Sequence, residues 1–166
     1  YGFFRFGQIT LDEVIKRKLK PTEEIEKEIR EGFRKKHGME AFAILNYPLI
    51  KKLLRKGNVV GDGLYSWSEF KYLKEKFGKR MVVIAVFSPP KIRHKRLNIR
   101  KSTKKDKNLR FRPLSLREAR KRDVAEIENI EKGGTIAMAD YTIINTNSLK
   151  SFKTKISILY RKINSS

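Results

Sequence analysis

The sequence has no cysteine and only two histidines among its 166 residues. The absence of cysteine excludes a disulfide framework and a thiolate metal site. His37 and His94 stand alone in the sequence, so a surface or helix-packing role is favoured over a zinc site for both. A chain without cysteine fits a reducing compartment, and we expect a cytoplasmic location.

Long apolar runs are also missing. No stretch reaches the roughly 18 apolar residues that a membrane-spanning helix needs. The first residues, Tyr1 to Phe6, are too short and too quickly polar for a signal peptide. Hydrophobic residues still make up 39% of the chain, including ten Phe and six Tyr, which is enough for a core. The length predicts a single domain over residues 1–166.

Acidic residues are scarce in one stretch of the second half. Between Lys91 and Arg122, fifteen basic residues stand against two acids, a local net charge of +13 out of +22. Such a stretch favours a polyanionic partner, either the phosphates of a nucleotide or a nucleic-acid backbone. Lys101 to Pro113 is nearly devoid of apolar side chains, which predicts either a lid that orders over a ligand or a disordered loop.

Apolar periodicity and capping residues predict alternating strands and helices. Ser66-x-x-Glu69 and Ser115-x-x-Glu118 are capping boxes, each of which opens a helix. Pro48 is expected to kink or restart the helix around it, and Gly133-Gly134 to end another. The expected helices are 9–19, 22–36, 39–55, 66–77, 90–99, 115–132 and 148–163.

Four strands are expected, at Phe3–Phe6, Asn58–Asp62, Met81–Phe87 and Ala139–Asn145. Seven consecutive apolar residues at 81–87 indicate a strand that is buried on both faces. The long connections between strands predict an α/β fold with a parallel sheet and helices on both of its faces. Ligands of such sheets bind at the carboxyl ends of the strands. That rule nominates Gly7, Gln8, Asp62, Gly63, Ser88, Asn145 and Thr146.

A set of motifs in the second half resembles a known family. They are Asp62-Gly63 after a strand, Arg96-Leu97-x-x-Arg100 on a helix, the tract Arg112 to Asp123, and Gly133 to Asn145. Together they resemble the dephospho-coenzyme A kinase-like and adenylate kinase-like P-loop proteins of archaea and bacteria. The resemblance covers Phe3 to Ile163 and is most specific from Arg112 onward.

The resemblance implies a P-loop NTPase fold of the nucleoside monophosphate kinase type, with ATP and Mg²⁺ as reagents and phosphoryl transfer as the reaction. By that likeness Asp62 assists Mg²⁺ through water or orients the acceptor, and Arg96, Arg100 and Arg122 neutralise charge on the transferred group. Asn145 and Thr146 are then expected near the adenine. The acceptor side is expected to involve Gly7, Gln8 and Gly63.

The sequence departs from the family pattern in its phosphate-binding loop. No G-x-x-x-x-G-K-[ST] motif occurs in the 166 residues. We therefore expect that the first strand and this loop, roughly 30 residues, precede Tyr1, and that this chain alone is inactive. Gln8, Leu11 and Ser66 also stand where related proteins carry an Asp, an Arg and an Arg, which leaves the acceptor open.

Simpler roles remain open for the same residues. Asp62 can cap the turn into the next helix, and Asn145 can end its strand by turning. Arg96 and Arg100 can form a solvated helix face, and Trp67 is favoured as a core residue. Two other functions also remain open: a nucleic-acid-binding protein on a degenerate kinase scaffold, supported by the basic stretch, and a non-catalytic interaction module.

Overall fold

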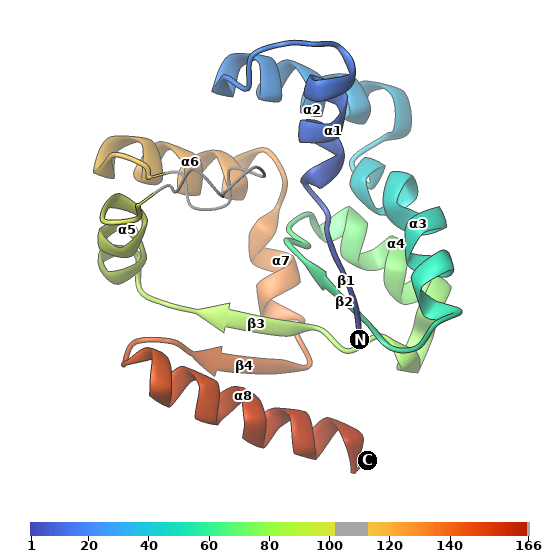
Figure 1. The fold of residues 1–166 in the computed structure, drawn as a ribbon, viewed down its shortest axis with the longest axis vertical. Coiled ribbons are helices and arrows are strands. Elements are labelled where there is room, and N and C mark those ends of the chain that lie inside the picture. The colour runs from blue at the N-terminus through green and yellow to red at the C-terminus, as the bar shows by residue number, and fades with distance from the viewer. Residues whose placement is uncertain (102–112, 166) are drawn as a thin grey trace. The chain divides into compact units, whose positions relative to one another are not determined.

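The structure, a computed structural model, describes residues 1–101 and 113–165. The chain is α/β, with short strands in parallel pairs and helices between them (Figure 1). It divides into two compact units: unit 1 is Tyr1–Met81 with Glu126–Thr135, and unit 2 is Val82–Ala125 with Ile136–Ser166. The expected α/β class and parallel pairing are confirmed. A single continuous sheet stays a prediction, since the strands of the described residues form two separate pairs.

Unit 1 is built on strands β1 (Gly2–Arg5) and β2 (Val59–Asp62). They are parallel, with Gly2 opposite Val59 and Arg5 opposite Asp62. The connection between them carries three helices, and α4 with a short 3-10 turn follows β2. These helices are α1 (Gln8–Lys16), α2 (Glu23–His37), α3 (Ala41–Leu54) and α4 (Trp67–Phe77).

Aromatic and small side chains form the core of unit 1. Phe4 and Phe6 of the β1 segment pack with Phe42 of α3 and Leu73 of α4. Gly61 of β2 makes this packing possible, because a Cβ there would lie 2.7 Å from the Phe4 ring. The core therefore requires glycine on the strand that faces it.

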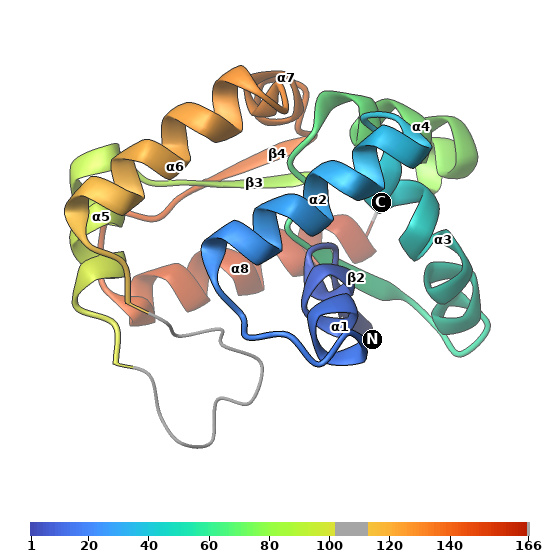
Figure 2. The same cartoon turned by 90° about the horizontal axis from the view of Figure 1, so that it is seen from above.

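Unit 2 is built on strands β3 (Ile84–Phe87) and β4 (Tyr141–Ile144), which pair in parallel (Figures 1 and 2). The Asp140 carboxylate accepts a hydrogen bond from the Val83 N–H at 2.7 Å, at the start of both strands. At the other end the Asn145 N–H donates to the Phe87 carbonyl at 2.7 Å. The helices are α5 (Pro90–Asn98), α6 (Leu116–Glu128), α7 (Lys132–Ala137) and α8 (Leu149–Asn164), of which α6 and α7 contribute residues to both units.

Helix α3 continues through Pro48, which rules out a restart there and leaves a kink as a prediction. Two other local predictions are wrong. α7 forms across Gly133-Gly134, where a break was expected. The glycine at 134 lets this helix lie against the Trp67 ring, because a Cβ there would come within 3.1 Å of it. β3 is not buried on both faces: Val86 is 54% and Ile84 41% exposed, and the two side chains lie on the same face of the strand.

The basic stretch is described only in part. Residues 102–112, which include most of the expected lid, lie outside the described residues. Helix α5 precedes these residues and helix α6 follows them. The predicted capping box at the start of α6 is present: the Ser115 N–H donates to the Glu118 carboxylate at 2.7 Å. None of the described helices is long and apolar enough to cross a bilayer.

Candidate functional site

The predicted site residues fall into two groups, one in each unit. Unit 1 contains Gly7, Gln8, Asp62 and Gly63, and unit 2 contains Arg96, Arg100, Arg122, Asn145 and Thr146. Each group lies at or after the carboxyl ends of parallel strands or on the helices that follow. The two groups are described separately below.

In unit 1, Asp62 presents an exposed carboxylate at the carboxyl end of β2. Its side chain is 65% exposed and lies 3.9 Å from the Arg5 guanidinium across the strand pair. It does not cap the next helix, because Ser66 is the N-cap of α4 and accepts a hydrogen bond from the Ser68 N–H at 3.2 Å. Gly63 has a φ of +88°, a conformation that glycine adopts without strain. Asp62 is therefore held at a strand end and remains available to solvent.

Gly7 and Gln8 begin α1 directly after β1. Gly7 is the N-cap residue and has no side chain to cap the helix. The Gln8 side-chain amide donates to the Asp12 carboxylate at 3.1 Å, an interaction within the same helix. The structure thus places both residues at the expected strand end, with the Gln8 side chain directed along its own helix.

A buried acid, Glu69, was not predicted as a functional residue. It is 3% exposed, and burial raises its pKa to about 7, against the opposing effects of Arg34 and of backbone N–H groups of Ser66, Tyr65 and Phe42. The sequence signal was present in the capping box that begins at Ser66, which predicts where the carboxyl bonds but not how deeply it is buried.

Arg34 of α2 faces this carboxyl from a half-buried position. Its guanidinium lies 5.3 Å from the centre of the Phe42 ring, and its Nε has no hydrogen-bond partner within the described residues. Burial lowers the pKa of Arg34, and the Glu69 charge opposes that effect. Arg34 of α2 and Glu69 of α4 therefore interact electrostatically, each opposing the effect of burial on the pKa of the other.

In unit 2, Arg96 binds the carboxyl ends of the strands themselves. Its guanidinium donates to the backbone carbonyl of Asn145 at 2.7 Å and to that of Asn147 at 2.9 Å. It also lies 3.4 Å from the Ser88 hydroxyl, which in turn donates to the Asn145 carbonyl. Arg96 is therefore neither a solvated residue nor one whose donors all face a ligand.

A second cluster joins α5 to α6 in the same unit. Arg93 donates to both oxygens of Asp123, at 3.2 and 2.6 Å, and to the Ser88 carbonyl at 2.9 Å. The buried His94 ring lies 2.5 Å from the same carboxylate. Burial opposes ionisation of Asp123, but the hydrogen bonds from Arg93 and His94 outweigh it and lower the pKa of this carboxyl. Nothing in the local sequence marks the cluster, because its members are about 30 residues apart.

The remaining predicted residues lie close to these two clusters in sequence. Arg100 follows the end of α5 and Arg122 lies on α6, and both are exposed. Asn145 and Thr146 are half-buried after β4, and the Thr146 hydroxyl is 3.5 Å from the Asn147 side-chain oxygen. Asn145 bonds through its backbone groups, so the interpretation of it as a strand-ending residue gains support.

Most of the net charge belongs to unit 2. Its residues include 20 Lys or Arg against four Asp or Glu, a net of +16 out of +22. The exposed cations of its described helices include Lys91 and Lys95 on α5 and Arg117, Arg120 and Lys121 on α6. The Arg93–Asp123 ion pair links α5 to α6, so the cations of the two helices are held in a fixed arrangement within this unit.

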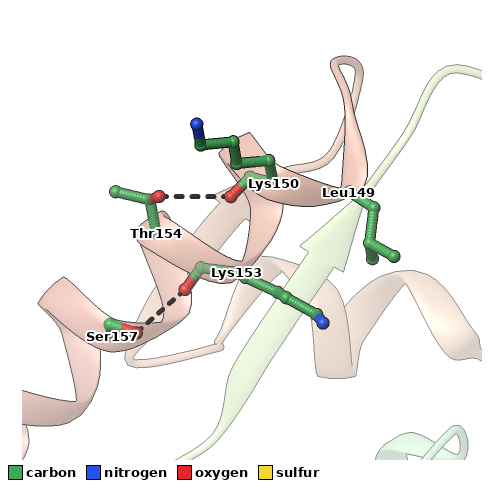
Figure 3. A pocket seen from close by; sticks show the side chains of 5 residues that line it. All are labelled: Leu149, Lys150, Lys153, Thr154 and Ser157. Carbon is green, nitrogen blue, oxygen red and sulfur yellow. Dashed lines mark hydrogen bonds between the residues drawn. The ribbon is translucent and has the colours of Figure 1, made fainter.

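A shallow depression of about 520 Å³ lies on α8 and is lined by Leu149, Lys150, Lys153, Thr154 and Ser157 (Figure 3). The Thr154 and Ser157 hydroxyls donate to carbonyls of their own helix, at 3.1 Å each. The two lysine ammonium groups point in different directions in Figure 3. The depression therefore has basic edges but no convergent donors for a compact anion.

No cluster of three or more His, Cys, Asp or Glu that could hold a metal occurs in the part of the chain that the structure describes. Asp62 is a single carboxylate. It fits Mg²⁺ only in the mode in which phosphates and water supply most of the ligands.

Comparison with known proteins identifies the family to which the chain belongs. It is 35% identical over 159 residues to a UPF0200 protein of Pyrococcus abyssi, covering 95% of this chain and 81% of that protein. It is 35% identical over 158 residues to a UPF0200 protein of Sulfurisphaera tokodaii, covering 93% and 82%. No family model matches the chain. This α/β protein belongs to the UPF0200 family.

A third relative is longer. A protein of Archaeoglobus fulgidus named UPF0200/UPF0201 is 32% identical over 158 residues, and the chain spans only 46% of its length. These names overturn the expected membership of the dephospho-coenzyme A kinase-like and adenylate kinase-like proteins. That expectation was wrong because it rested on short motifs, whereas the relatives match along nearly the whole chain.

Proposed function

We propose that this protein binds phosphate-bearing small molecules, nucleotides above all, through the cationic surface of unit 2, and that it serves an ATP-dependent phosphotransferase reaction. The proposal includes a fold of the P-loop NTPase type, with helices on both faces of a parallel sheet, and a cytoplasmic location. The observation that carries it is the net charge of +16 in unit 2, with exposed lysines and arginines on α5 and α6.

The cations of unit 2 divide by role. Arg93 and Arg96 are hydrogen-bonded to protein acceptors and fix α5 on the strand ends. Lys91, Lys95 and Arg117 are exposed and can reach phosphate oxygens. Binding is therefore expected to depend on the second set, and the first set to matter through the shape of the unit.

ATP and Mg²⁺ are the proposed reagents. Bound Mg²⁺ would neutralise charge on the phosphates during transfer. In unit 1, Asp62 can hold hydrated Mg²⁺ through water, since its carboxylate is exposed at the strand end.

A nucleic-acid backbone is the second candidate, favoured by one observation. The exposed cations of unit 2 are spread over three helices, α5, α6 and α8, which suits an extended chain of phosphates. Against it, aromatic platforms for stacking bases are few on these helices: Phe152 and Tyr160 both belong to α8.

The test compares two ligands under identical conditions. Binding of a fluorescent ATP analogue with Mg²⁺, and of a labelled 20-nucleotide single strand, is measured at 50 and 200 mM salt. Nucleotide binding that is tighter than strand binding at 200 mM salt supports the first proposal. Strand binding that falls by roughly a thousandfold over this range, as expected for about six phosphate contacts, with no nucleotide binding, would favour the second.

Two double variants test whether the binding surface lies on unit 2. Lys91→Glu with Lys95→Glu removes two exposed cations from α5, and Lys52→Glu with Lys56→Glu makes the same change of charge and spacing in unit 1. The first double variant is expected to weaken binding at least about tenfold, and the second far less. Equal losses would show that net charge alone, and not unit 2, attracts the ligand.

A further inference from the structure

Helices α3 and α4 of unit 1 carry a second cationic surface, and this one contains aromatic rings. We propose that it binds single-stranded nucleic acid, with bases stacked on the rings of Tyr47 and Tyr72 and phosphates held by the neighbouring cations. This interaction is separate from the nucleotide binding proposed for unit 2, and the variants described below distinguish the two.

Three aromatic rings meet between α3 and α4, which pack side by side (Figures 1 and 2). The Tyr47 ring of α3 lies 6.2 Å from the Tyr72 ring and 5.8 Å from the Phe77 ring of α4, centre to centre. All three residues are half-buried. Tyr72 and Phe77 also pack on the core of unit 1, so the core holds the two rings that Tyr47 contacts. The rings therefore form one cluster that joins the two helices.

Lysine side chains extend over two of these rings. The Lys51 ammonium lies 5.7 Å from the centre of the Tyr47 ring, and the Lys76 ammonium lies 5.4 Å from the centre of the Tyr72 ring. Each lysine follows its tyrosine by four residues, so cation and ring share one face of their helix. Arg55 follows Lys51 by one more turn, and all three cations are exposed. These contacts join rings and cations from both helices into a single surface.

The segments that carry this surface are strongly basic. Residues 51–56 contain four basic residues and no acid, and residues 71–80 contain five basic residues and one acid, Glu75. The Glu75 carboxylate accepts a hydrogen bond from the Lys76 ammonium at 3.0 Å, which offsets its charge. The net charge of the two segments is +8. Such a concentration of positive charge complements a polyanion.

The combination of rings and cations favours a single strand over other polyanions. Unpaired bases stack on aromatic rings whatever their sequence, and the backbone brings one phosphate with each base. A base that stacks on Tyr47 displaces the Lys51 ammonium from the ring. This exchange is favourable because an exposed cation–π contact is weaker than base stacking, and the displaced ammonium can bind a phosphate. An acidic peptide or an anionic bilayer would use the cations but not the rings.

The experiment uses the full 166-residue chain and two oligonucleotides that differ only in their bases. A fluorescein-labelled single strand of about 20 thymidines, and an abasic strand of equal length, are titrated at low salt and followed by anisotropy. The abasic strand keeps every phosphate. Because it cannot stack, it is expected to bind at least about fivefold more weakly than the thymidine strand.

Charge variants separate the Tyr47 face of α3 from the rest of the helix. Lys51→Glu with Arg55→Glu reverses two exposed cations on this face and is expected to weaken strand binding at least about tenfold. Lys52→Glu with Lys56→Glu makes the same change of charge and spacing, offset by one residue and therefore on another side of the helix. This control is expected to lose less than about threefold. Both pairs should leave binding of the ATP analogue largely unchanged, since that ligand is proposed for unit 2.

Ring variants test whether bases stack on Tyr47. Tyr47→Leu replaces the ring by an apolar side chain and is expected to weaken binding of the thymidine strand at least about fivefold. The same variant should bind the abasic strand as the wild type does, because the phosphate contacts remain. Tyr47→Phe keeps the ring and should bind both strands as the wild type does. Circular dichroism confirms that all variants remain folded.

Several outcomes would overturn the proposal. Equal binding of the abasic and thymidine strands, or of Tyr47→Leu and wild type, would exclude stacking on these rings. Equal losses in the two charge pairs on α3 would mean that net charge alone attracts the strand. A loss in Lys91→Glu with Lys95→Glu, and none in Lys51→Glu with Arg55→Glu, would place the strand on unit 2. Polyglutamate that displaces the strand at equal concentration of charge would identify an acidic protein segment as the partner.

Discussion

The guanidinium of Arg96 lies 2.7 Å from the backbone carbonyl oxygen of Asn145, which bonds a helix side chain to the carboxyl end of a neighbouring strand. The same group reaches Asn147 at 2.9 Å. From the sequence, the resemblance to kinases predicted that Arg96 neutralises charge on the transferred phosphoryl group. The geometry instead makes it a residue that positions the strand ends, so its loss should be seen first in stability.

Arg96→Ala is expected to lower the free energy of unfolding by about 1–3 kcal/mol, because two backbone carbonyls lose a charged donor. Urea unfolding followed by circular dichroism measures the loss. Lys95→Ala, one residue away and exposed, is the control and should change stability by less than about 0.5 kcal/mol. If Arg96→Ala leaves stability unchanged but abolishes nucleotide binding, the positioning role is wrong.

Asp123→Ala is expected to loosen α5 from α6, since Arg93 and His94 both bond to this carboxylate. The folded pKa of Asp123 lies below its ordinary value of 3.8, so its contribution is present above that pH and is lost as pH falls through the folded pKa. The difference in unfolding free energy between wild type and variant should therefore shrink on going from pH 7 to pH 3. A difference that grows over this range would contradict the pairing.

Glu69 predicts the opposite dependence in unit 1. Its folded pKa, about 7, lies above the ordinary value of 4.5, so the folded state binds the proton more tightly and loses stability as pH rises from 4.5 to 7. The loss should be on the order of 2–3 kcal/mol. Unfolding followed by fluorescence of Trp67, the single tryptophan, measures it. Glu69→Gln keeps the shape and should remove this part of the pH dependence; an unchanged profile in the variant would assign it to other groups.

Gly61→Ala is expected to destabilise unit 1 by about 1–3 kcal/mol, because the new methyl group would lie 2.7 Å from the buried Phe4 ring. Gly133→Ala is the matched control: its Cβ would meet nothing within 4 Å, and alanine favours the helix there. Thermal unfolding compares the two. Equal effects would mean that backbone freedom, and not the approach of Phe4, makes Gly61 necessary.

The 166-residue chain is expected to bind nucleotide without turning it over above background. It contains no Gly-rich loop ending in Lys-Ser or Lys-Thr, the usual device for positioning the transferred phosphate. A phosphate-release assay with ATP and Mg²⁺ measures turnover. Activity that Asp62→Ala abolishes would show that this chain positions phosphates in another way.

Local signals in the sequence predicted most of the secondary structure. Ser66 and Ser115 with their partners Glu69 and Glu118 marked the starts of α4 and α6 correctly, because a capping box is a local arrangement. The sequence did not predict α7, because glycine has a low helix propensity and the packing of Gly134 against Trp67 is not visible in the local sequence. Propensity gave way to packing there.

The site was harder to predict than the fold. The strand ends were located at Asp62 and, within one residue, at Asn145, because an apolar run followed by polar residues marks the end of a strand locally. The role of Arg96 was not predictable, because its acceptors are carbonyl oxygens about 50 residues further along the chain. Likewise, the apolar run around Val86 does not show how much of each face of its strand is covered in the folded protein.

The bond between Asp140 and Val83 also bears on the order in which unit 2 folds. It joins residues 57 apart in the sequence, each of which directly precedes its strand, and so aligns β3 with β4 at their first residues. Closing so long a loop is entropically costly and slow. The Arg93–Asp123 contact spans only 30 residues inside that loop, so α5 and α6 can dock first and shorten the chain that the strands must then close. Pairing of β3 with β4 is therefore expected to be the late step.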